Sequence, residues 1–268
     1  MTRYITRLAM TALVLWGCSA CNFSDYAFRK ELGISANALN NQCPMKTPVG
    51  ELTRIFVEND TLCTLVKTDT YIPQSAIIMP YALLSLSEDT LYAPLTTLLG
   101  EMADHNVWLR LRLDTKNKSH FYYASPQLLD SVCHGRFSDK ETARVKVQMH
   151  VLLAQQRMPY KINNQMTMTD INYEPGLVTM AYTVAEDEQV NLSNEAFRTT
   201  AQLYVRQRIW KDLMSAKKTT TQDVIKNFCL AGCKVRYTCT GDTSGGHVEI
   251  IFTQGDLRMI LSHFSIHI

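Results

Sequence analysis

The pattern of apolar and polar residues along the chain predicts the same series of elements twice. In each half, helical spacing runs up to a residue pair that ends in proline, Cys43-Pro44 or Met158-Pro159. Proline cannot continue a helix, and it pushes the preceding residue toward extended geometry. Two strands are then expected on either side of a polar turn, at residues 58–60 and 174–176, where the residue types favour tight turns.

A helical region and a second strand pair complete each half. In the second half we expect helices over residues 194–216 and 221–230. Three prolines shorten and interrupt the equivalent region of the first half: Pro73, Pro80 and Pro94. The closing strand pairs are expected at residues 107–125 and 233–253, because both segments alternate apolar with polar positions.

The helix that opens the second half has clear start signals. Ser138 and Asp139 are the expected N-caps, since short polar side chains there can bond free backbone N–H groups. Val145, Met149 and Leu152 would then lie on one apolar face.

Matching residues between the halves indicate an internal repeat. Pro44 aligns with Pro159, Lys46 with Lys161, Leu62 with Leu177 and Thr64 with Thr179, all without a gap. Hairpins separated by helices are typical of α+β proteins with antiparallel sheets. We therefore predict two tandem copies of a helix, β-hairpin, helix, β-hairpin unit, at residues 37–135 and 136–268, after a tether and first helix at 18–36.

The first 17 residues are typical of a bacterial lipoprotein signal peptide. Arg3 and Arg7 form a positive start, and an apolar run follows that is too short to span a bilayer. The ending Leu15-Trp16-Gly17-Cys18 resembles a lipobox, which implies that Cys18 is acylated and becomes the new N-terminus. An ordinary signal peptide cleaved elsewhere is the alternative. Ser19 is not the Asp linked with retention in the inner membrane, so the resemblance favours the outer membrane.

The charge balance argues against nucleic acid as a partner. The chain has 27 Lys and Arg residues and 25 Asp and Glu residues. Removing the leader takes away two arginines, which leaves 25 of each sign and a net charge of zero. A neutral chain without a basic run has no general attraction for phosphate backbones.

The segment "GDTSGG" resembles the surround of the nucleophile in chymotrypsin-like proteases, but the repeat favours a turn. Thr243 separates Asp242 from Ser244, and an inserted residue would displace the amides that surround an oxyanion. In the first copy the same position holds a polar turn around Asn117. We predict that Ser244 lies in an exposed hairpin loop.

Most of the eight cysteines are predicted to be buried and reduced. Five of them align with apolar residues of the other copy: Cys43, Cys63, Cys229, Cys233 and Cys239. Free cysteine packs as a small apolar residue. The alternative is one disulfide among Cys21, Cys43, Cys133 and Cys229, since an exported protein allows disulfides.

No residue pattern predicts a cofactor, a metal site or a catalytic group. Cys133 and His134 are adjacent in sequence, which does not place them as a dyad in space. His263 and His267 lie four residues apart, but the segment "LSHFSIHI" has a strand-like pattern that would separate their side chains. No phosphate-binding loop or nucleophile elbow is present.

Two motifs resemble a group of uncharacterised exported lipoproteins of anaerobic Gram-negative bacteria. The first is Asn-x-x-Cys-Pro-Met at residues 40–45, and the second is a closing hairpin with Ser-Gly near its turn, at residues 244–245. The resemblance covers most of residues 37–255, with the opening motif in the first copy and the closing motif in the second. It implies export and a fold, and no activity.

Two functions fit these observations. The first is a non-catalytic binding or interaction module, held to the envelope membrane by lipid, whose partner is another envelope protein or a peptide. The second is an envelope hydrolase or an inhibitor of one, with a site that only a structure would reveal. A pocket of converging polar groups would favour the hydrolase, and an exposed apolar patch would favour the binding module.

Overall fold

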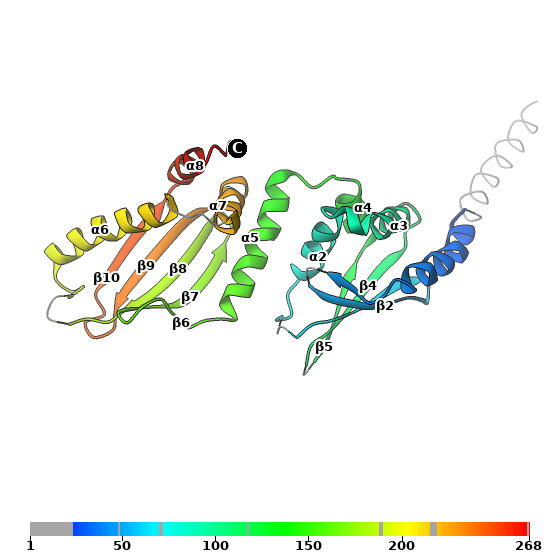
Figure 1. Ribbon diagram of the computed structural model, residues 1–268, viewed down its shortest axis with the longest axis horizontal. Coiled ribbons are helices and arrows are strands. Elements are labelled where there is room, and N and C mark those ends of the chain that lie inside the picture. The colour runs from blue at the N-terminus through cyan, green and yellow to red at the C-terminus, as the bar shows by residue number, and fades with distance from the viewer. Residues whose placement is uncertain are drawn as a thin grey trace, which may run out of the picture. The chain divides into compact units, whose positions relative to one another are not determined.

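The computed structural model describes residues 24–47, 49–69, 72–116, 118–187, 190–214, 219–266 and 268. The predicted signal peptide and Cys18 lie outside these residues. The chain divides into two compact units, Met1–Arg136 and Phe137–Ile268. Each unit combines one five-stranded sheet with several helices (Figure 1), which confirms the α+β class.

The first unit contains the predicted helix, hairpin, helical segment and hairpin, with one further strand before the first hairpin and one further helix after the second. It begins with a helix at residues 24–40. Its further elements are β1 (Met45–Thr47), β2 (Gly50–Glu58), β3 (Thr61–Lys67), α2 (Ile78–Ser87), the 3-10 helix η1 (Thr90–Tyr92), α3 (Ala93–Asp104), β4 (Trp108–Asp114), β5 (Ser119–Ala124) and α4 (Pro126–Cys133).

The second unit has nearly the same order. Its elements are α5 (Asp139–Gln155), β6 (Tyr160–Lys161), β7 (Met166–Glu174), β8 (Leu177–Val184), α6 (Glu195–Met214), α7 (Thr219–Leu230), β9 (Lys234–Gly241), β10 (His247–Phe252) and α8 (Gln254–His263). The largest difference lies in the first helix after the first hairpin, because α6 has 20 residues and α2 has 10.

Each sheet is mixed rather than wholly antiparallel, which corrects the prediction. The strand orders are β1-β2-β3-β4-β5 and β10-β9-β8-β7-β6. The hairpins are antiparallel, but β3 pairs with β4 and β8 pairs with β9 in parallel. The helical segment between the two hairpins forms a crossover that returns the chain to the same end of the sheet, as parallel neighbours require.

Both units share further details. In each, a bulge interrupts the first hairpin, between Leu52 and Arg54 or between Met168 and Asp170. Ser125 caps α4 and Thr253 caps α8, each through its side chain. These features are expected of tandem copies, although duplication as an origin stays a prediction.

Helix α5 begins where the sequence predicted and buries apolar residues on more than the predicted stripe. Ser138 forms a capping box with Glu141, which satisfies free N–H groups at the helix start. The core of the second unit receives Ala143, Val147 and Val151 from α5, spaced four residues apart. Of the predicted stripe, Val145 and Met149 are also buried and Leu152 is half-buried, but none of the three belongs to this core.

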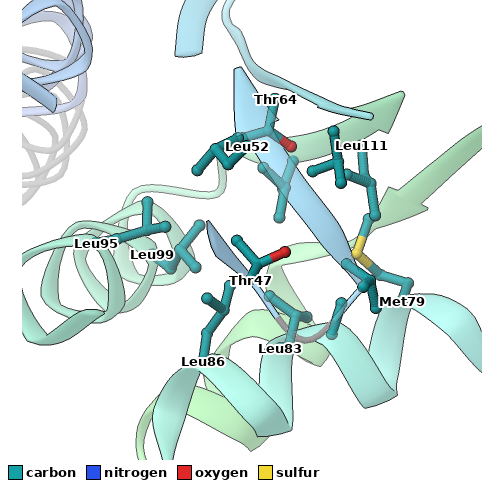
Figure 2. Close-up of a pocket in the computed structure, with 13 residues that line it drawn as sticks. Thr47, Leu52, Thr64, Met79, Leu83, Leu86, Leu95, Leu99 and Leu111 are labelled. Carbon is teal, nitrogen blue, oxygen red and sulfur yellow. The ribbon is translucent and has the colours of Figure 1, made fainter. Parts of the chain in front are cut away.

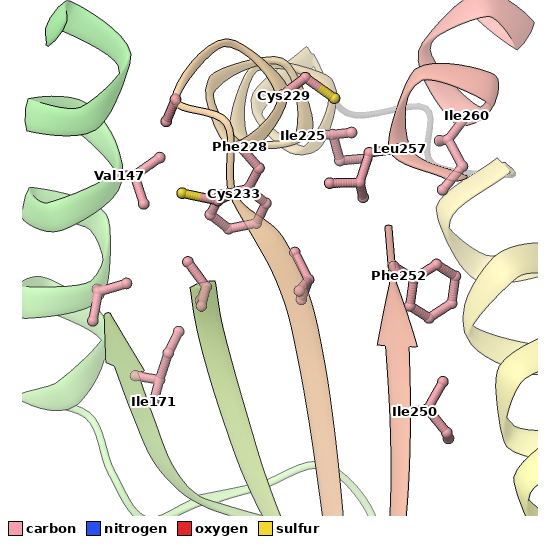
Figure 3. Close-up of a cluster of buried hydrophobic side chains, with 14 of the residues drawn as sticks. Val147, Ile171, Ile225, Phe228, Cys229, Cys233, Ile250, Phe252, Leu257 and Ile260 are labelled. Atoms are coloured by element: carbon pink, nitrogen blue, oxygen red, sulfur yellow. The ribbon is translucent and has the colours of Figure 1, made fainter. Parts of the chain in front are cut away.

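Four of the predicted apolar cysteines are buried. Cys63 lies in the first unit; Cys229, Cys233 and Cys239 lie in the core of the second. Figure 3 shows Cys229 and Cys233 among Phe228, Ile225 and Val147. Cys43 is only half-buried. The described cysteines are free thiols, including Cys133, and Cys21 lies outside the described residues.

The C-terminal segment is another correction. The strand-like pattern was predicted for residues 261–268, but residues 261–263 belong to helix α8 (Gln254–His263), whose Leu257, Ile260 and Leu261 are buried. Thr253 and Asp256 form a capping box that starts this helix. Within the described residues, no helix combines the length and apolar character needed to cross a membrane.

Candidate functional site

One face of the first sheet is open and carries arginines and aromatic rings. Strand β4 shows why, because Leu109, Leu111 and Leu113 are buried while the alternate positions are not. Successive side chains of a strand point to opposite faces. Figure 1 shows α2, α3 and α4 grouped over one face of this sheet. Trp108, Arg110 and Arg112 therefore project from the other face.

The strand register extends this face across four strands. One row runs from Phe56 through Cys63 and Arg110 to Tyr123. The next row consists of Arg54, Leu65, Arg112 and Phe121. We call this surface the arginine–aromatic face, and define it by the outward residues Arg54, Phe56, Glu58, Leu65, Lys67, Trp108, Arg110, Arg112, Asp114, Phe121 and Tyr123.

Three aromatic side chains of this face are about half exposed. Trp108 is 47%, Phe121 46% and Tyr123 58% exposed. A depression of about 600 Å³ lies on the face, lined by residues that include Arg54, Phe56, Arg110, Arg112 and Phe121. Large exposed apolar groups gathered in one place are typical of binding surfaces. Trp, Tyr and Arg are also the residues that most often dominate binding energy.

The charges that line the depression are unequal. Four cations, Arg54, Lys67, Arg110 and Arg112, face two carboxylates, Glu58 and Asp114. Arg110 binds Glu58, and Arg112 Nε donates to Asp114 Oδ1 at 2.8 Å. Arg54 has no carboxylate partner among the described residues, and its guanidinium lies 4.8 Å from the Phe56 ring centroid. Glu51, in register with Lys67, lies outside the depression.

The ion pair of Arg112 is well formed. Partial burial works to raise the pKa of Asp114, but hydrogen bonds from Ser119 and Arg112 outweigh it, and the pKa lies below its ordinary value. The carboxylate is therefore ionised at neutral pH and holds Arg112 in place. Arg112 also lies 5.9 Å from the centroid of the Phe121 ring, a distance at which a cation is attracted by the ring face.

A separate cavity in the core of the first unit has no features of a specific site. It measures about 40 Å³ and lies between the sheet and helices α2 and α3. Figure 2 shows Leu52, Leu83, Leu99 and Met79 around it. The hydroxyls of Thr47 and Thr64, which also line it, donate to the backbone oxygens of Gly50 and Arg110. Without converging polar groups, the cavity can orient no ligand, and we interpret it as a packing void.

Ser244 lies in the exposed turn between β9 and β10, as predicted, and has a structural role. Its hydroxyl donates to Glu186 Oε1 at 2.7 Å and its backbone N–H to Glu186 Oε2 at 2.6 Å. The backbone N–H groups of Thr243 and Leu192 also donate to this carboxylate. The hydrogen bonds from Ser244, followed by those from the other amides, lower the pKa of Glu186.

Two glycines make this contact possible. A Cβ on Gly241 would overlap the Glu186 carboxylate, and one on Gly246 would overlap the backbone of Leu192 and Ser193. The loop therefore holds the segment that leads from β8 to α6. The Gly-Asp-Thr-Ser-Gly-Gly sequence serves this close approach, in which Ser244 bonds a carboxylate rather than a histidine.

The thiols are poorly suited to nucleophilic chemistry. Burial raises the pKa of Cys133, Cys229 and Cys239 to about 11. A thiol is nucleophilic only as the thiolate, which is scarce at neutral pH for these groups. His134, next to Cys133 in sequence, directs Nδ1 to Asp130 Oδ1 at 2.9 Å.

One cluster offers ligand atoms that a metal ion could use. Asp104, Asp130 and His134 place a carboxylate or imidazole atom each within 4.8 Å of one another. Arg136 Nη1 already lies 2.6 Å from Asp130 Oδ2, which supplies a positive charge to the cluster. His263 ends α8 and stacks edge-on against Phe264, whereas His267 lies outside the described residues.

The arginine–aromatic face was not predicted from the sequence, although part of its signal was visible there. In "WLRLRL" the arginines occupy every second position opposite leucine, and Phe121 and Tyr123 alternate in the same way. Period-two alternation predicts which residues share a face. It does not predict that the polar face stays uncovered, because that depends on where the helices pack.

Comparisons with known proteins give only remote structural similarity. No protein-family model matches the chain, and no curated protein sequence matches it. One similar solved structure is a candidate secreted protein from Pseudomonas aeruginosa, with 14% identity and a TM-score of 0.34, covering 46% of this chain and 98% of the other. Another is the pilotin of the Vibrio vulnificus type 2 secretion system, with 10% identity and a TM-score of 0.29, covering 44% and 94%.

Proposed function

We propose that this chain is a lipid-anchored binding protein of the bacterial cell envelope. Its arginine–aromatic face would bind an acidic segment of another envelope protein, without catalysing a reaction. The anchor would be Cys18, and the outer membrane is the favoured location, as the leader and the resemblance to exported lipoproteins imply.

The exposure of the arginine–aromatic face carries this proposal. Trp108, Phe121 and Tyr123 are each about half exposed on the sheet surface that also carries Arg54. Aromatic and arginine side chains are enriched in binding surfaces, where they contribute most of the affinity. The excess of cations in the depression favours an acidic partner, since complementary charge increases the rate of encounter and selects against partners of like charge.

The hydrolase or hydrolase inhibitor has less support. The buried thiols have raised pKa values, and Ser244 bonds Glu186. The enclosed cavity is apolar. None of these features supplies an activated nucleophile with a base beside it.

The proposal can be tested by reducing the charge of the face. Arg54→Gln with Lys67→Gln removes two of the four cations that line the depression, and Lys30→Gln with Lys226→Gln removes two exposed cations elsewhere as a matched control. Each lipidated protein is cross-linked in cells, solubilised and purified. The captured partner is identified by mass, purified and titrated directly against each variant.

We expect the Arg54 and Lys67 variant to bind the purified partner about tenfold more weakly, as loss of about 1.4 kcal/mol implies. The control variant should keep wild-type affinity, and added salt should weaken wild-type binding. Equal affinity of both variants for the partner would contradict the proposal.

A further inference from the structure

The outer edge of the second sheet is covered by side chains of α6. Gln202 Nε2 donates to the carbonyl oxygen of Glu249 at 2.7 Å, and Arg206 Nη1 donates to the carbonyl oxygen of Ile251 at 2.8 Å. Figure 1 shows α6 beside β10, the last strand of this sheet. Two donors from one helix therefore satisfy the carbonyl groups that an edge strand would otherwise expose to pairing.

The first sheet has an equivalent edge at β5. Thr115 N donates to Lys118 O across the hairpin turn, so Thr115 and Lys118 form a hydrogen-bonded pair. Such pairs alternate with non-bonded pairs along an antiparallel ladder. From the register, Leu113 with His120 and Leu111 with Tyr122 are bonded pairs. Phe121 and Tyr123 then direct both their N–H and C=O groups away from β4.

The edge of β5 lacks the cover that β10 has. Within the described residues, no protein group is hydrogen-bonded to the backbone N–H or C=O of Phe121 or Tyr123. Helix α2 packs against β5, but it is half the length of α6 and carries neither Gln nor Arg. The outward N–H and C=O groups of Phe121 and Tyr123 are therefore available to another strand.

We infer that an extended, acidic peptide segment of the partner adds to the first sheet as a sixth strand along β5. This inference rests on the proposed function and names the form in which the partner binds. An extended segment presents N–H donors and C=O acceptors at the spacing of about 7 Å that Phe121 and Tyr123 repeat. At β10 of the second sheet, the side chains of Gln202 and Arg206 already provide donors to outward carbonyl groups, as an added strand would do at β5.

The charges beside the edge select an acidic segment over a second copy of this chain. Arg112 extends toward β5, since its guanidinium lies over the Phe121 ring. A carboxylate on the added strand would lie next to Phe121 and within reach of this side chain. Pairing of two β5 strands would instead bring two faces with excess cations together, and like charges close together are destabilising.

A synthetic peptide provides the test. It alternates Glu with Val over about eight residues, has blocked ends, and is titrated against the purified full chain while the amide signals of residues 119–123 are followed by NMR. A second peptide of the same sequence carries N-methyl groups on the alternate amides that would face β5, which removes these donors and leaves its charge unchanged.

Two substitutions at Phe121 separate the contribution of its backbone N–H group from that of its ring. Phe121→Pro removes an N–H that faces away from β4, so the ladder of the hairpin is kept. Phe121→Ala removes the ring and keeps the N–H. Far-ultraviolet circular dichroism shows whether each variant is folded. If Phe121→Pro does not fold, the comparison of the two peptides on the wild-type chain still tests the inference.

We expect the peptide to bind with Kd below about 1 mM and to shift the amides of Phe121 and Tyr123 most. The methylated peptide should bind at least about tenfold more weakly. Phe121→Pro should likewise bind about tenfold more weakly than Phe121→Ala.

Four results would overturn the inference. Equal binding of both peptides would leave the face as a charged binding surface, and the proposed function would stand without strand addition. Polygalacturonate carries carboxylates but no peptide backbone, so it can compete with the peptide only through charge. If it displaces the peptide equally well from wild type and from Phe121→Pro, binding depends on charge alone and strand addition is again wrong. A dimer of the chain that Phe121→Pro dissociates would identify a second copy as the occupant. If neither peptide binds while the purified partner still depends on Arg54 and Lys67, strand addition alone is wrong.

Discussion

Truncation of Phe252 should unfold the second unit at lower denaturant than the first. Phe252 has no exposed surface and its ring meets three side chains. Tyr237 lies edge-on with centroids 5.6 Å apart, Trp210 is stacked at 6.2 Å, and the Arg206 guanidinium lies 5.1 Å from the ring centroid. Phe252→Ala removes all three contacts and leaves a void at the end of β10.

The loss follows from core substitutions of this kind. Phe→Ala in a packed core costs about 3 to 5 kcal/mol, and we take about 4 kcal/mol because the Phe252 side chain is fully buried. With an m-value of about 2 kcal/mol per molar urea, the midpoint should fall by about 2 M. Should the variant not fold, Phe252→Leu removes less volume, and we expect a loss of about 1 to 2 kcal/mol.

Tryptophan fluorescence separates the two units. Trp108 lies in the first unit and Trp210 in the second, and Trp16 lies in the predicted leader and is left out of the protein used for this measurement. In a Trp108→Phe background, Trp210 therefore reports on the second unit, and in a Trp210→Phe background, Trp108 reports on the first. The core around Phe252 consists of residues of the second unit alone, so the Trp210 transition should move while the Trp108 transition stays.

A matched change in the other core completes the test. Leu113 is fully buried in the first unit, and Leu113→Ala should shift the Trp108 transition and not that of Trp210. A Phe252→Ala protein in which both transitions move equally would refute the reasoning that each unit is stabilised by its own core.

Three further predictions concern the leader, the thiols and the loop of Ser244. Wild type should incorporate radioactive fatty acid and Cys18→Ala should not, and equal labelling would exclude the anchor. Cys63→Val should lower stability by no more than about 1.5 kcal/mol, as near-isosteric apolar swaps do, and peptide mapping without reductant should find Cys63, Cys229, Cys233 and Cys239 free. The pKa of Glu186 is lowered from 4.5, so its carboxylate stabilises the second unit above that pH, and the effect is lost as the pH falls through the folded-state pKa. In wild type, the urea midpoint of the second unit, followed by Trp210 fluorescence, should therefore fall as the pH is lowered through the acid range. Glu186→Gln should reduce this fall, and an equal fall in both proteins would contradict the prediction.

Local sequence signals predicted most elements of this fold. Proline ended the helices before Pro44 and Pro159, and the polar turns at 58–60 and 174–176 joined the first hairpins. The N-cap at Ser138 was also predicted. These features depend on residues near one another in sequence, where backbone geometry and capping decide the outcome.

The errors arose where distant segments decide. Whether β3 and β4 run parallel depends on the path of the crossover between them, which periodicity does not encode. The Glu186 contact joins residues 58 positions apart. The helix at 254–263 is a different case, because Thr253 and Asp256 form a capping box that was readable in sequence, and the alternation in "LSHFSIHI" was given too much weight.

The prolines of the first unit connect its sequence to its open edge. Helix α2, which corresponds to α6, begins only at Ile78. Pro73 lies before this helix and Pro80 lies in its first turn. Proline is tolerated in the first turn of a helix and disrupts it further along, so a 20-residue helix like α6 could not start earlier across this segment. A shorter α2 cannot supply the donors that Gln202 and Arg206 give to β10. Loss of helix length in one unit therefore leaves β5 uncovered beside the arginine–aromatic face, and the two features together define one surface that the second unit does not have.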